Sequence, residues 1–445
     1  MTKKFLISAA IILFLLASAT EAFFIFNKQE TPVPEPLPEV PSPAAPGNEP
    51  ENEPGNSSIP AVLNEEGATP AGIKNAADAN NQFATALYSK IKDEGNVFFS
   101  PYSISSAFGM VYEGAAGKTA EEIRAAFGFP NDSGERRASF ASIFNRLNDK
   151  NAKYDLRSAN ALWAQKDYVF LNSYIDVLKN FYGAEANNVD FKESAENVRQ
   201  EINSWVESKT NNKIKDLFAE GSLNAMTRLV LTNAVYFKGL WESPFEKANT
   251  SQQDFYLDSG SKVSVSTMNK KEDFSYAESG GVKVLEMPYQ GEKLSMVIFL
   301  PAKGSTISFE ESLSLEKITE LRNKLTGADV VVSIPKFKFD ESYSLNDSLK
   351  KLGVSEAFVP GGADFSGMDG TKNLFIDLVV HKAFIEVNEE GTEAAAATGV
   401  TMSATAMPVE TEPFTFKADH PFIFLIQDNE SGNILFMGKV ANPNS

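Results

Sequence analysis

The chain contains no cysteine among its 445 residues. Disulfide bonds, thiol catalysis, iron–sulfur clusters, cysteine zinc sites and a lipid-modified N-terminal cysteine are therefore excluded. Only two histidines are present, His381 and His420, so a helical two-histidine zinc motif is excluded as well. A Ser-His-Asp hydrolase would have to use one of them, and no Gly-x-Ser-x-Gly motif is present. We expect no metal, no cofactor and no enzymatic activity.

Positive charge is also scarce. The 41 Lys and Arg residues face 59 Asp and Glu residues, which gives a formal net charge of −18. This balance argues against nucleic acid or an anionic membrane surface as a partner. Residues 114–119 imitate the end of a phosphate loop, but Tyr112 occupies the position of a required glycine, so we expect no nucleotide binding. The 34 phenylalanines and 42% hydrophobic residues are enough to bury a large core.

The N-terminus has the pattern of an export signal. Lys3 and Lys4 precede an uncharged run, and residues 17–19 offer small side chains at a cleavage spacing. The apolar stretch of residues 5–26 is also long enough to span a bilayer if it stays uncut. Residues 1–26 are therefore predicted to be a signal peptide or an N-terminal membrane anchor. With the two lysines inside, either would place the remaining chain outside the cytoplasm.

A proline-rich and glutamate-rich segment follows. Residues 31–60 hold 10 of the 22 prolines and no lysine or arginine, so they cannot collapse into a core. We predict a disordered linker over residues 27–75, which in extended form would reach up to roughly 90 Å. A leader without any spacing role is the alternative. The folded domain is predicted over residues 76–445.

Within this domain, helical patterns come mostly first and strand patterns mostly later, which predicts an α+β fold. Phe83, Leu87 and Ile91 form the stripe of an amphipathic helix. Thr119 with Glu122 matches a capping box at the start of another helix. Further helices are expected at residues 173–182 and 196–209, and strands at 293–300 and 330–339.

An unusual strand pattern covers residues 389–398. With a period of two, its small residues fall on one face, namely Thr392, Ala394, Ala396 and Thr398. Such a face could slide between two existing strands without a large cavity. On composition alone, an alanine-rich helix or a flexible linker is equally compatible. Strand patterns on both sides favour a strand, and residues 399–413 predict a long exposed loop.

Four sequence blocks in this chain resemble the serpins, the suicide inhibitors of proteases. They are residues 96–104, residues 231–239 with Trp241, residues 334–337, and the segment 389–398 followed by 418–422. They occur in serpin order and at serpin spacing, and they cover roughly residues 76–444. The resemblance implies the serpin fold, in which helices pack around a large central β-sheet plus smaller sheets. It also implies an exposed reactive loop at about 389–413.

The resemblance assigns roles to particular residues. The predicted hinge of the loop consists of Glu389, Glu390, Gly391, Thr392, Glu393, Ala394, Ala395, Ala396, Ala397 and Thr398. A polar shutter cluster beneath the central sheet is expected from Ser100, Ser103, Asn233 and His381. At the top of this sheet, the breach is expected from Trp241, Lys336 and Glu389. Without the resemblance, ordinary core packing or a surface salt bridge would explain these residues.

The implied activity is a mechanical trap for a serine protease. The protease cuts the loop and forms an acyl-enzyme, and the freed hinge then inserts into the sheet and distorts the bound protease. Family spacing places the cut between Thr405 and Ala406, within a range of about 402–410, which predicts an elastase-like or subtilisin-like target. A cut after Met402 would suit a chymotrypsin-like target instead. We expect an extracellular monomer, secreted or tethered, and keep as the alternative a serpin-fold binding or carrier protein that never inserts its loop.

Overall fold

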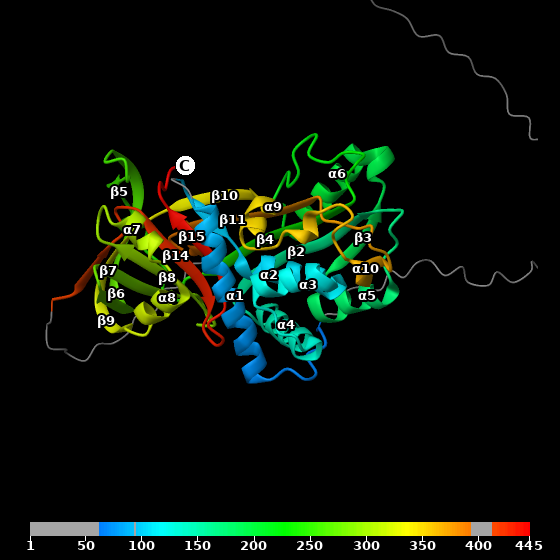
Figure 1. Ribbon diagram of the computed structural model, residues 1–445. Coiled ribbons are helices and arrows are strands. Elements are labelled where there is room, and N and C mark those ends of the chain that lie inside the picture. The colour runs from blue at the N-terminus through cyan, green and yellow to red at the C-terminus, as the bar shows by residue number, and fades with distance from the viewer. Residues whose placement is uncertain (1–61, 93–94, 393–411) are drawn as a thin grey trace, which may run out of the picture. The chain divides into compact units, whose positions relative to one another are not determined.

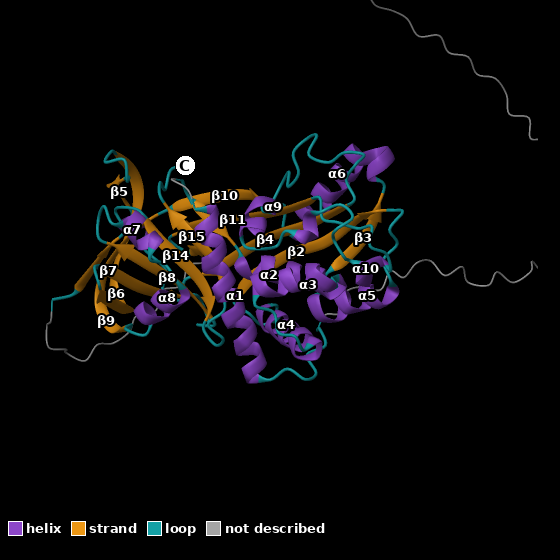
Figure 2. Ribbon diagram, viewed as in Figure 1, coloured by secondary structure: helices purple, strands orange, loops and turns teal. Residues whose placement is uncertain are grey.

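The computed structural model describes residues 62–92, 95–392 and 412–445. Helices and strands alternate along this part of the chain without a regular repeat (Figure 2). The helices are α1 (Pro70–Ile91), α2 (Pro101–Gly114), α3 (Gly117–Phe127), α4 (Ser133–Leu147), α5 (Asn172–Val177), α6 (Phe191–Lys209), α7 (Thr306–Glu311), α8 (Leu315–Arg322), α9 (Asn346–Lys351) and α10 (Ser366–Asp369). A π-helical turn at Leu178–Tyr182 continues α5.

The strands of the described chain form two sheets. The six-stranded sheet has the order β10 (Phe337–Ser344), β11 (Leu378–Asn388), β12 (Gly391–Thr392), β4 (Leu229–Leu240), β2 (Tyr154–Gln165) and β3 (Glu185–Val189). The nine-stranded sheet has the order β1 (Val97–Phe99), β15 (Ile434–Val440), β14 (Phe422–Asp428), β8 (Leu294–Pro301), β7 (Val282–Pro288), β6 (Lys262–Ser279), β9 (Thr326–Pro335) and β13 (Phe414–Lys417), with β5 (Ser251–Tyr256) paired to β6. The predicted α+β class is confirmed.

Helices cover both faces of the six-stranded sheet. Helix α6 packs on one face, where Ile202 lies in a buried cluster with Val230 and Tyr236 of β4. Helices α2 to α5 lie on the other side of this sheet (Figure 1), where Leu229 and Leu231 of the same strand meet the helical core. Side chains alternate between the two faces of a strand, so β4 needs apolar residues at successive positions.

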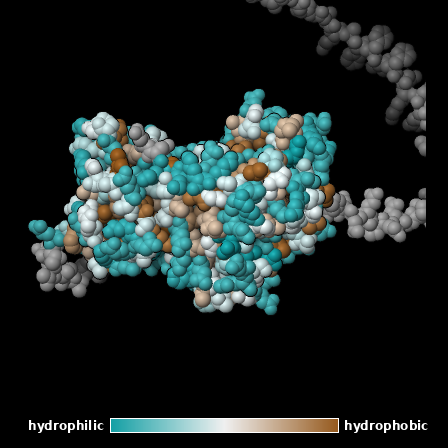
Figure 3. All heavy atoms as spheres, viewed as in Figure 1, coloured by the Kyte–Doolittle hydropathy of each residue, from teal (hydrophilic) through white to brown (hydrophobic). Residues whose placement is uncertain are grey.

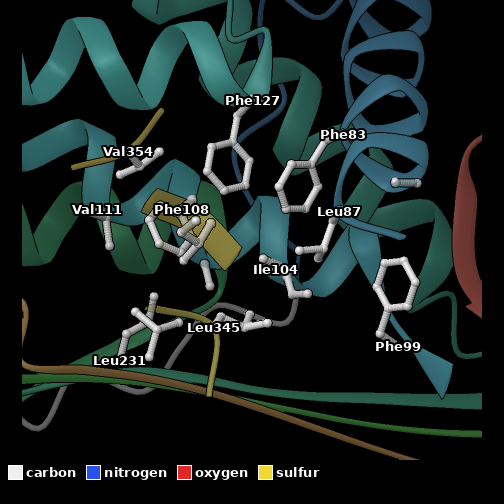
Figure 4. Packing of buried hydrophobic residues seen from close by; sticks show 14 of the residues in the cluster. Phe83, Leu87, Phe99, Ile104, Phe108, Val111, Phe127, Leu231, Leu345 and Val354 are labelled. Atoms are coloured by element: carbon white, nitrogen blue, oxygen red, sulfur yellow. The ribbon is translucent and has the colours of Figure 1, made fainter. Parts of the chain in front are cut away.

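The core between α1, α2 and α3 is aromatic. Phe127 stacks on Phe83 with 4.2 Å between ring centroids and on Phe108 with 4.6 Å (Figure 4). Leu231 and Leu345 close the same cluster from the sheet side. The predicted stripe of Phe83, Leu87 and Ile91 therefore belongs to α1 and faces this core.

The folded chain extends further toward the N-terminus than the predicted boundary at residue 76. Helix α1 begins at Pro70, where the side chain of Thr69 accepts a hydrogen bond from the Gly72 N–H. Leu63 is buried, and its backbone N–H and C=O both bond to the side chain of Asn145. The start of the folded domain is not visible in the composition, because residues 62–75 are as rich in polar and small residues as the linker before them.

The predicted capping box is wrong. Helix α3 begins at Gly117, so Thr119 and Glu122 lie inside the helix. Thr119 accepts a hydrogen bond from the backbone of Asp364. Glu122 accepts two, from the N–H groups of Ser355 and Glu356 at the start of the 3₁₀ turn Glu356–Phe358. These side chains therefore bond to residues distant in sequence and not to the backbone at the start of their own helix. The strand expected over 330–339 is likewise interrupted at Lys336, between β9 and β10.

The face of the molecule in Figure 3 is covered mainly by hydrophilic residues. Among the helices that the structure describes, none combines the length and the apolar character that a bilayer crossing requires. The predicted signal or anchor at residues 1–26 and most of the predicted linker lie outside the described residues.

We predict that Phe127→Ala lowers the apparent free energy of unfolding by about 3–5 kcal/mol, because it removes an aromatic side chain from a closely packed core. Urea titration followed by circular dichroism measures the change. Met226→Ala is the control, since the Met226 side chain is 71% exposed and its loss should change stability by less than about 0.5 kcal/mol. Equal effects of the two substitutions would contradict the assignment of Phe127 to the core.

Candidate functional site

Two residues of the predicted hinge, Gly391 and Thr392, already form a strand. β12 pairs antiparallel with β11 through Val387↔Thr392 and antiparallel with β4 through Thr392↔Gly239. Nearer the other end of the sheet, β11 and β4 pair directly and in parallel, from Leu378↔Val230 to Phe384↔Tyr236. At the top of the sheet, β11 and β4 are thus separated by the width of one strand. The hinge residues of β12 occupy the space between them.

Gly391 is required by the close approach of β12 to β4. Its φ of 152° lies in a region that favours glycine. A Cβ at this position would meet the carbonyl oxygen of Gly239 at 2.1 Å and Cα of Leu240 at 2.7 Å. Any larger residue would force the two strands apart.

Thr392 is buried at the point where the opening ends. Its hydroxyl lies 2.7 Å from the hydroxyl of Tyr289, and Tyr289 stacks on Trp241 with 4.7 Å between ring centroids. Trp241 in turn donates its backbone N–H to the carbonyl of Glu390 at 2.9 Å and its indole N–H to the carbonyl of Asn388 at 3.1 Å. The predicted breach residue Trp241 therefore bonds to the hinge through its backbone and to the residue just before the hinge through its ring.

The other two predicted breach residues form an ion pair. Lys336 Nζ lies 2.9 Å from Glu389 Oε2, and Thr250 donates a hydrogen bond to Glu389 Oε1 at 2.8 Å. Burial acts to raise the pKa of Glu389, but the hydrogen bonds and the charge of Lys336 outweigh it and lower this pKa. The break between β9 and β10 is what brings Lys336 to this position.

The four predicted shutter residues lie together and are wholly buried. The Ser100 N–H donates to Nε2 of His381 at 3.0 Å, and Nδ1 of His381 contacts Oδ1 of Asn233. Asn233 Nδ2 donates to the hydroxyl of Ser103 at 2.7 Å, and the Ser103 N–H donates to Oγ of Ser100 at 3.1 Å. Buried polar groups need partners, and this ring of bonds supplies them.

The bonding pattern fixes the state of His381. Because Nε2 accepts from Ser100, the neutral ring carries its proton on Nδ1, which donates to Asn233. Burial lowers the pKa of His381 to about 3, so the ring stays neutral through the physiological range. His381 and Asn233 face each other across the seam between β11 and β4, so this bond spans the line along which the two strands would separate.

Sequence reasoning missed two members of this cluster. Ser158 lies 2.9 Å from the hydroxyl of Ser103, and Asn160 accepts from Ser103 and Asn233. Both come from β2, where they stand at alternate positions and so share one face. That period was visible in the sequence, but polar residues at alternate positions usually indicate a solvent-facing strand.

Much of the predicted reactive loop lies outside the described residues. This applies to the hinge residues Glu393, Ala394, Ala395, Ala396, Ala397 and Thr398 and to the predicted cut between Thr405 and Ala406. The assigned roles of hinge, shutter and breach stay predictions. Within residues 62–92, 95–392 and 412–445, no group of three or more acidic or histidine side chains is arranged to hold a metal ion.

We predict that His381 makes stability depend on pH. In the unfolded chain its pKa is about 6.5, whereas in the folded domain it is about 3. Below about pH 6.5 the unfolded state therefore binds more protons, and stability falls as the pH falls. Relative to His381→Gln, the natural chain should lose up to about 1.4 kcal/mol per pH unit between about pH 6 and pH 4.

Urea titrations of both chains across this range measure the difference in slope. His420 is present in both chains and cancels. Parallel stability curves for the natural chain and His381→Gln would contradict burial of a neutral His381.

A family model, Serpin (serine protease inhibitor), matches residues 78–443. The human leukocyte elastase inhibitor is 43% identical over 384 residues, which is 83% of this chain and all of that protein. The family is described as one of serine protease inhibitors and is not a family of enzymes, in agreement with the expectation that the chain is not an enzyme.

Solved structures give the same answer for the fold. Serpin48 of the insect Tenebrio molitor is 35% identical, with a TM-score of 0.74 over 83% of this chain and 98% of that chain. Human thyroxine-binding globulin, solved as a complex with its hormone, is 30% identical, with a TM-score of 0.76 over 84% and 99%. The family match, the two open strands and the strand that enters between them lead to one conclusion. The chain belongs to the serpin family and has the serpin fold.

Proposed function

We propose that this protein is a suicide-substrate inhibitor of a serine protease, which it traps by inserting its cleaved reactive loop between β11 and β4. The observation that carries the proposal is β12, since Gly391 and Thr392 are already paired with both neighbours. Insertion of a serpin loop into its own sheet is an established form of strand addition. The hinge beyond Thr392 needs only to continue along the path that Gly391 and Thr392 occupy.

The register defines what further insertion would require. Six residues on from Thr392, the same pairing would bring Thr398 opposite both His381 and Asn233. The positions between them would alternate in face, with Ala394 and Ala396 on the side of Thr392. Small side chains fit this path, because β11 and β4 are already packed on both faces.

Insertion would also improve the pairing of the sheet. Now, β11 and β4 share one parallel ladder below β12. An inserted strand would be antiparallel to both neighbours, as β12 is, so two antiparallel ladders would replace one parallel ladder. Antiparallel pairing is slightly more stable per residue. Before the loop is cut, both of its ends are tied to the sheets, at Thr392 in β12 and at Phe414 in β13.

A serine protease of the elastase-like or subtilisin-like kind is the proposed target. The names of the mammalian relatives, leukocyte elastase inhibitors, support this class. We further propose an extracellular monomer, secreted or tethered through residues 5–26. The alternative is a serpin-fold carrier, for which the likeness to thyroxine-binding globulin gives a precedent. The inhibitor is favoured because the inward-facing residues of the hinge are all small, with no bulky or charged side chain among them.

We predict that Thr392→Arg turns the inhibitor into a substrate. Thr392 is fully buried, so arginine would place an unpaired charge in the sheet at a cost of several kcal/mol and would slow insertion. The measurement is incubation with a panel of elastase-like and subtilisin-like proteases, followed by denaturing electrophoresis. The natural chain should give a covalent complex, and the variant only cut protein.

Thr319→Arg, which introduces the same change at an exposed position of α8, is the matched control and should still trap the protease. A stable complex with Thr392→Arg at unchanged stoichiometry would contradict the inward position of this residue. Mass spectrometry of the released peptide then locates the cut relative to Thr405 and Ala406.

We also predict that a cut in the loop stabilises the domain. A protease that escapes trapping should nick the chain between residues 400 and 412, and the apparent melting temperature should rise by tens of degrees, because the intact form is held by a kinetic barrier. In an ordinary protein, nicking an exposed loop leaves stability unchanged or lowers it. Scanning calorimetry of intact and nicked protein measures the shift.

Nicked Thr392→Arg is the control, since its loop is cut but the buried arginine opposes insertion, so its melting temperature should rise much less. Equal melting temperatures of the intact and nicked natural chain would overturn the inhibitor and favour the carrier.

A further inference from the structure

The residue just before β11 carries a carboxylate that bonds to the start of β4. The N–H groups of Arg228 and Leu229 donate to Oδ2 of Asp377 at 2.5 and 3.1 Å. The backbone N–H of Asp377 donates to the carbonyl of Leu229 at 2.9 Å. Asp377 therefore joins the two strands one residue beyond Leu378↔Val230, the first pair of their parallel ladder.

Asp377 is held in place from a second side and is partly withdrawn from water. Asn346, at the start of α9, donates Nδ2 to the carbonyl of Asp377 at 2.7 Å and accepts from the Val379 N–H at 2.9 Å. Burial raises the pKa of the Asp377 carboxyl, although the two backbone N–H groups and the charge of Arg228 act to lower it. Hydrogen bonds to a charged group are stronger than neutral ones. The bonds of Asp377 therefore resist separation of β11 and β4 at this end of the seam.

The register of β12 gives the level at which an inserted strand would meet these bonds. Ten residues on from Thr392, the pairing of β12 with both neighbours would bring Met402 opposite Asp377 and Leu229. An inserted strand would move β11 and β4 apart by about one strand spacing, which is about 4.8 Å. The Asp377 carboxylate could not follow the start of β4 over that distance, so its bonds would break.

A shorter insertion would leave these bonds in place. β11 and β4 rejoin at Phe384↔Tyr236, which lies three residues beyond the level of Thr392. With the same spacing, an insertion that ends at Thr398 would allow the strands to rejoin before the level of Asp377. Insertion as far as the proposed cut after Thr405 would pass that level.

We propose that the bonds from Asp377 to Arg228 and Leu229 form a lower latch on the seam and set the barrier to the last part of loop insertion. Asp377 is a positioning residue, because it holds the two strands together and makes no contact with the protease. The shutter lies at the level of Thr398, so an entering strand meets the lower latch only after it has passed the shutter. This inference rests on the proposed function and adds a separate, later barrier to it.

Two synthetic peptides that copy the loop test the lower latch without any protease. The short peptide has the sequence of residues 393–398 and the long peptide that of residues 393–405, each with an N-terminal fluorescein. Fluorescence anisotropy with the full chain measures both dissociation constants. Asp377→Ala should tighten binding of the long peptide about tenfold, because the bonds that this peptide must break are absent. Binding of the short peptide should change by less than about twofold.

Two further variants complete the experiment. Asp377→Asn keeps a carbonyl oxygen as an acceptor for the same N–H groups, so it should tighten binding of the long peptide less than Asp377→Ala does. Asp347→Ala removes a carboxylate of α9 whose side chain is 86% exposed, and it should change neither dissociation constant.

The outcomes separate the lower latch from the proposed function. Equal changes for both peptides in Asp377→Ala, or an unchanged affinity for the long peptide, would overturn the latch and leave loop insertion in place. Binding of neither peptide to any of the chains would show that the seam admits no strand, and the proposed function would then fall together with the latch.

Discussion

The seam between β11 and β4 is the constraint on which the rest of this domain depends. Below β12 the two strands are joined by one parallel ladder and by the contact of His381 with Asn233. At the level of β12, this strand of two residues separates them. A sheet that is closed at one end and open at the other has an incomplete set of backbone partners. The proposed function assigns the hinge beyond Thr392 to the vacant register.

The surrounding structure is bonded to both ends of this seam. Ser100 is both the N-cap of α2 and the donor to His381, so the start of a helix is bonded to the seam. At the top, the Lys336–Glu389 pair and Trp241 hold the chain that leads into β12. The shutter and breach clusters therefore lie at two positions along the seam between β11 and β4. Each cluster is built from segments that are distant in sequence.

The order of helical and strand patterns predicted the α+β class, and four sequence blocks carried the resemblance that predicted the serpin fold. It also predicted the residues that meet in the shutter and breach, although not their bonds. Ser158 and Asn160 escaped notice because alternate polar residues look the same on a buried strand as on an exposed one. Thr119 and Glu122 match the local pattern of a capping box, yet their side chains accept hydrogen bonds from Asp364 and from the chain near Glu356. The interruption at Lys336 could not be predicted either, because the strand pattern of the sequence continues through this residue.

The pairing of Thr392 with Val387 and Gly239 selects a strand by register and side-chain size, and covalent connection has no part in that selection. A loop from a second copy of the chain presents the same sequence to the same opening. On the proposed mechanism, the molecule's own loop would prevail because its attachment gives it a high effective concentration near the sheet. A concentrated solution would reduce that advantage, so linkage between copies would then compete with insertion within one molecule.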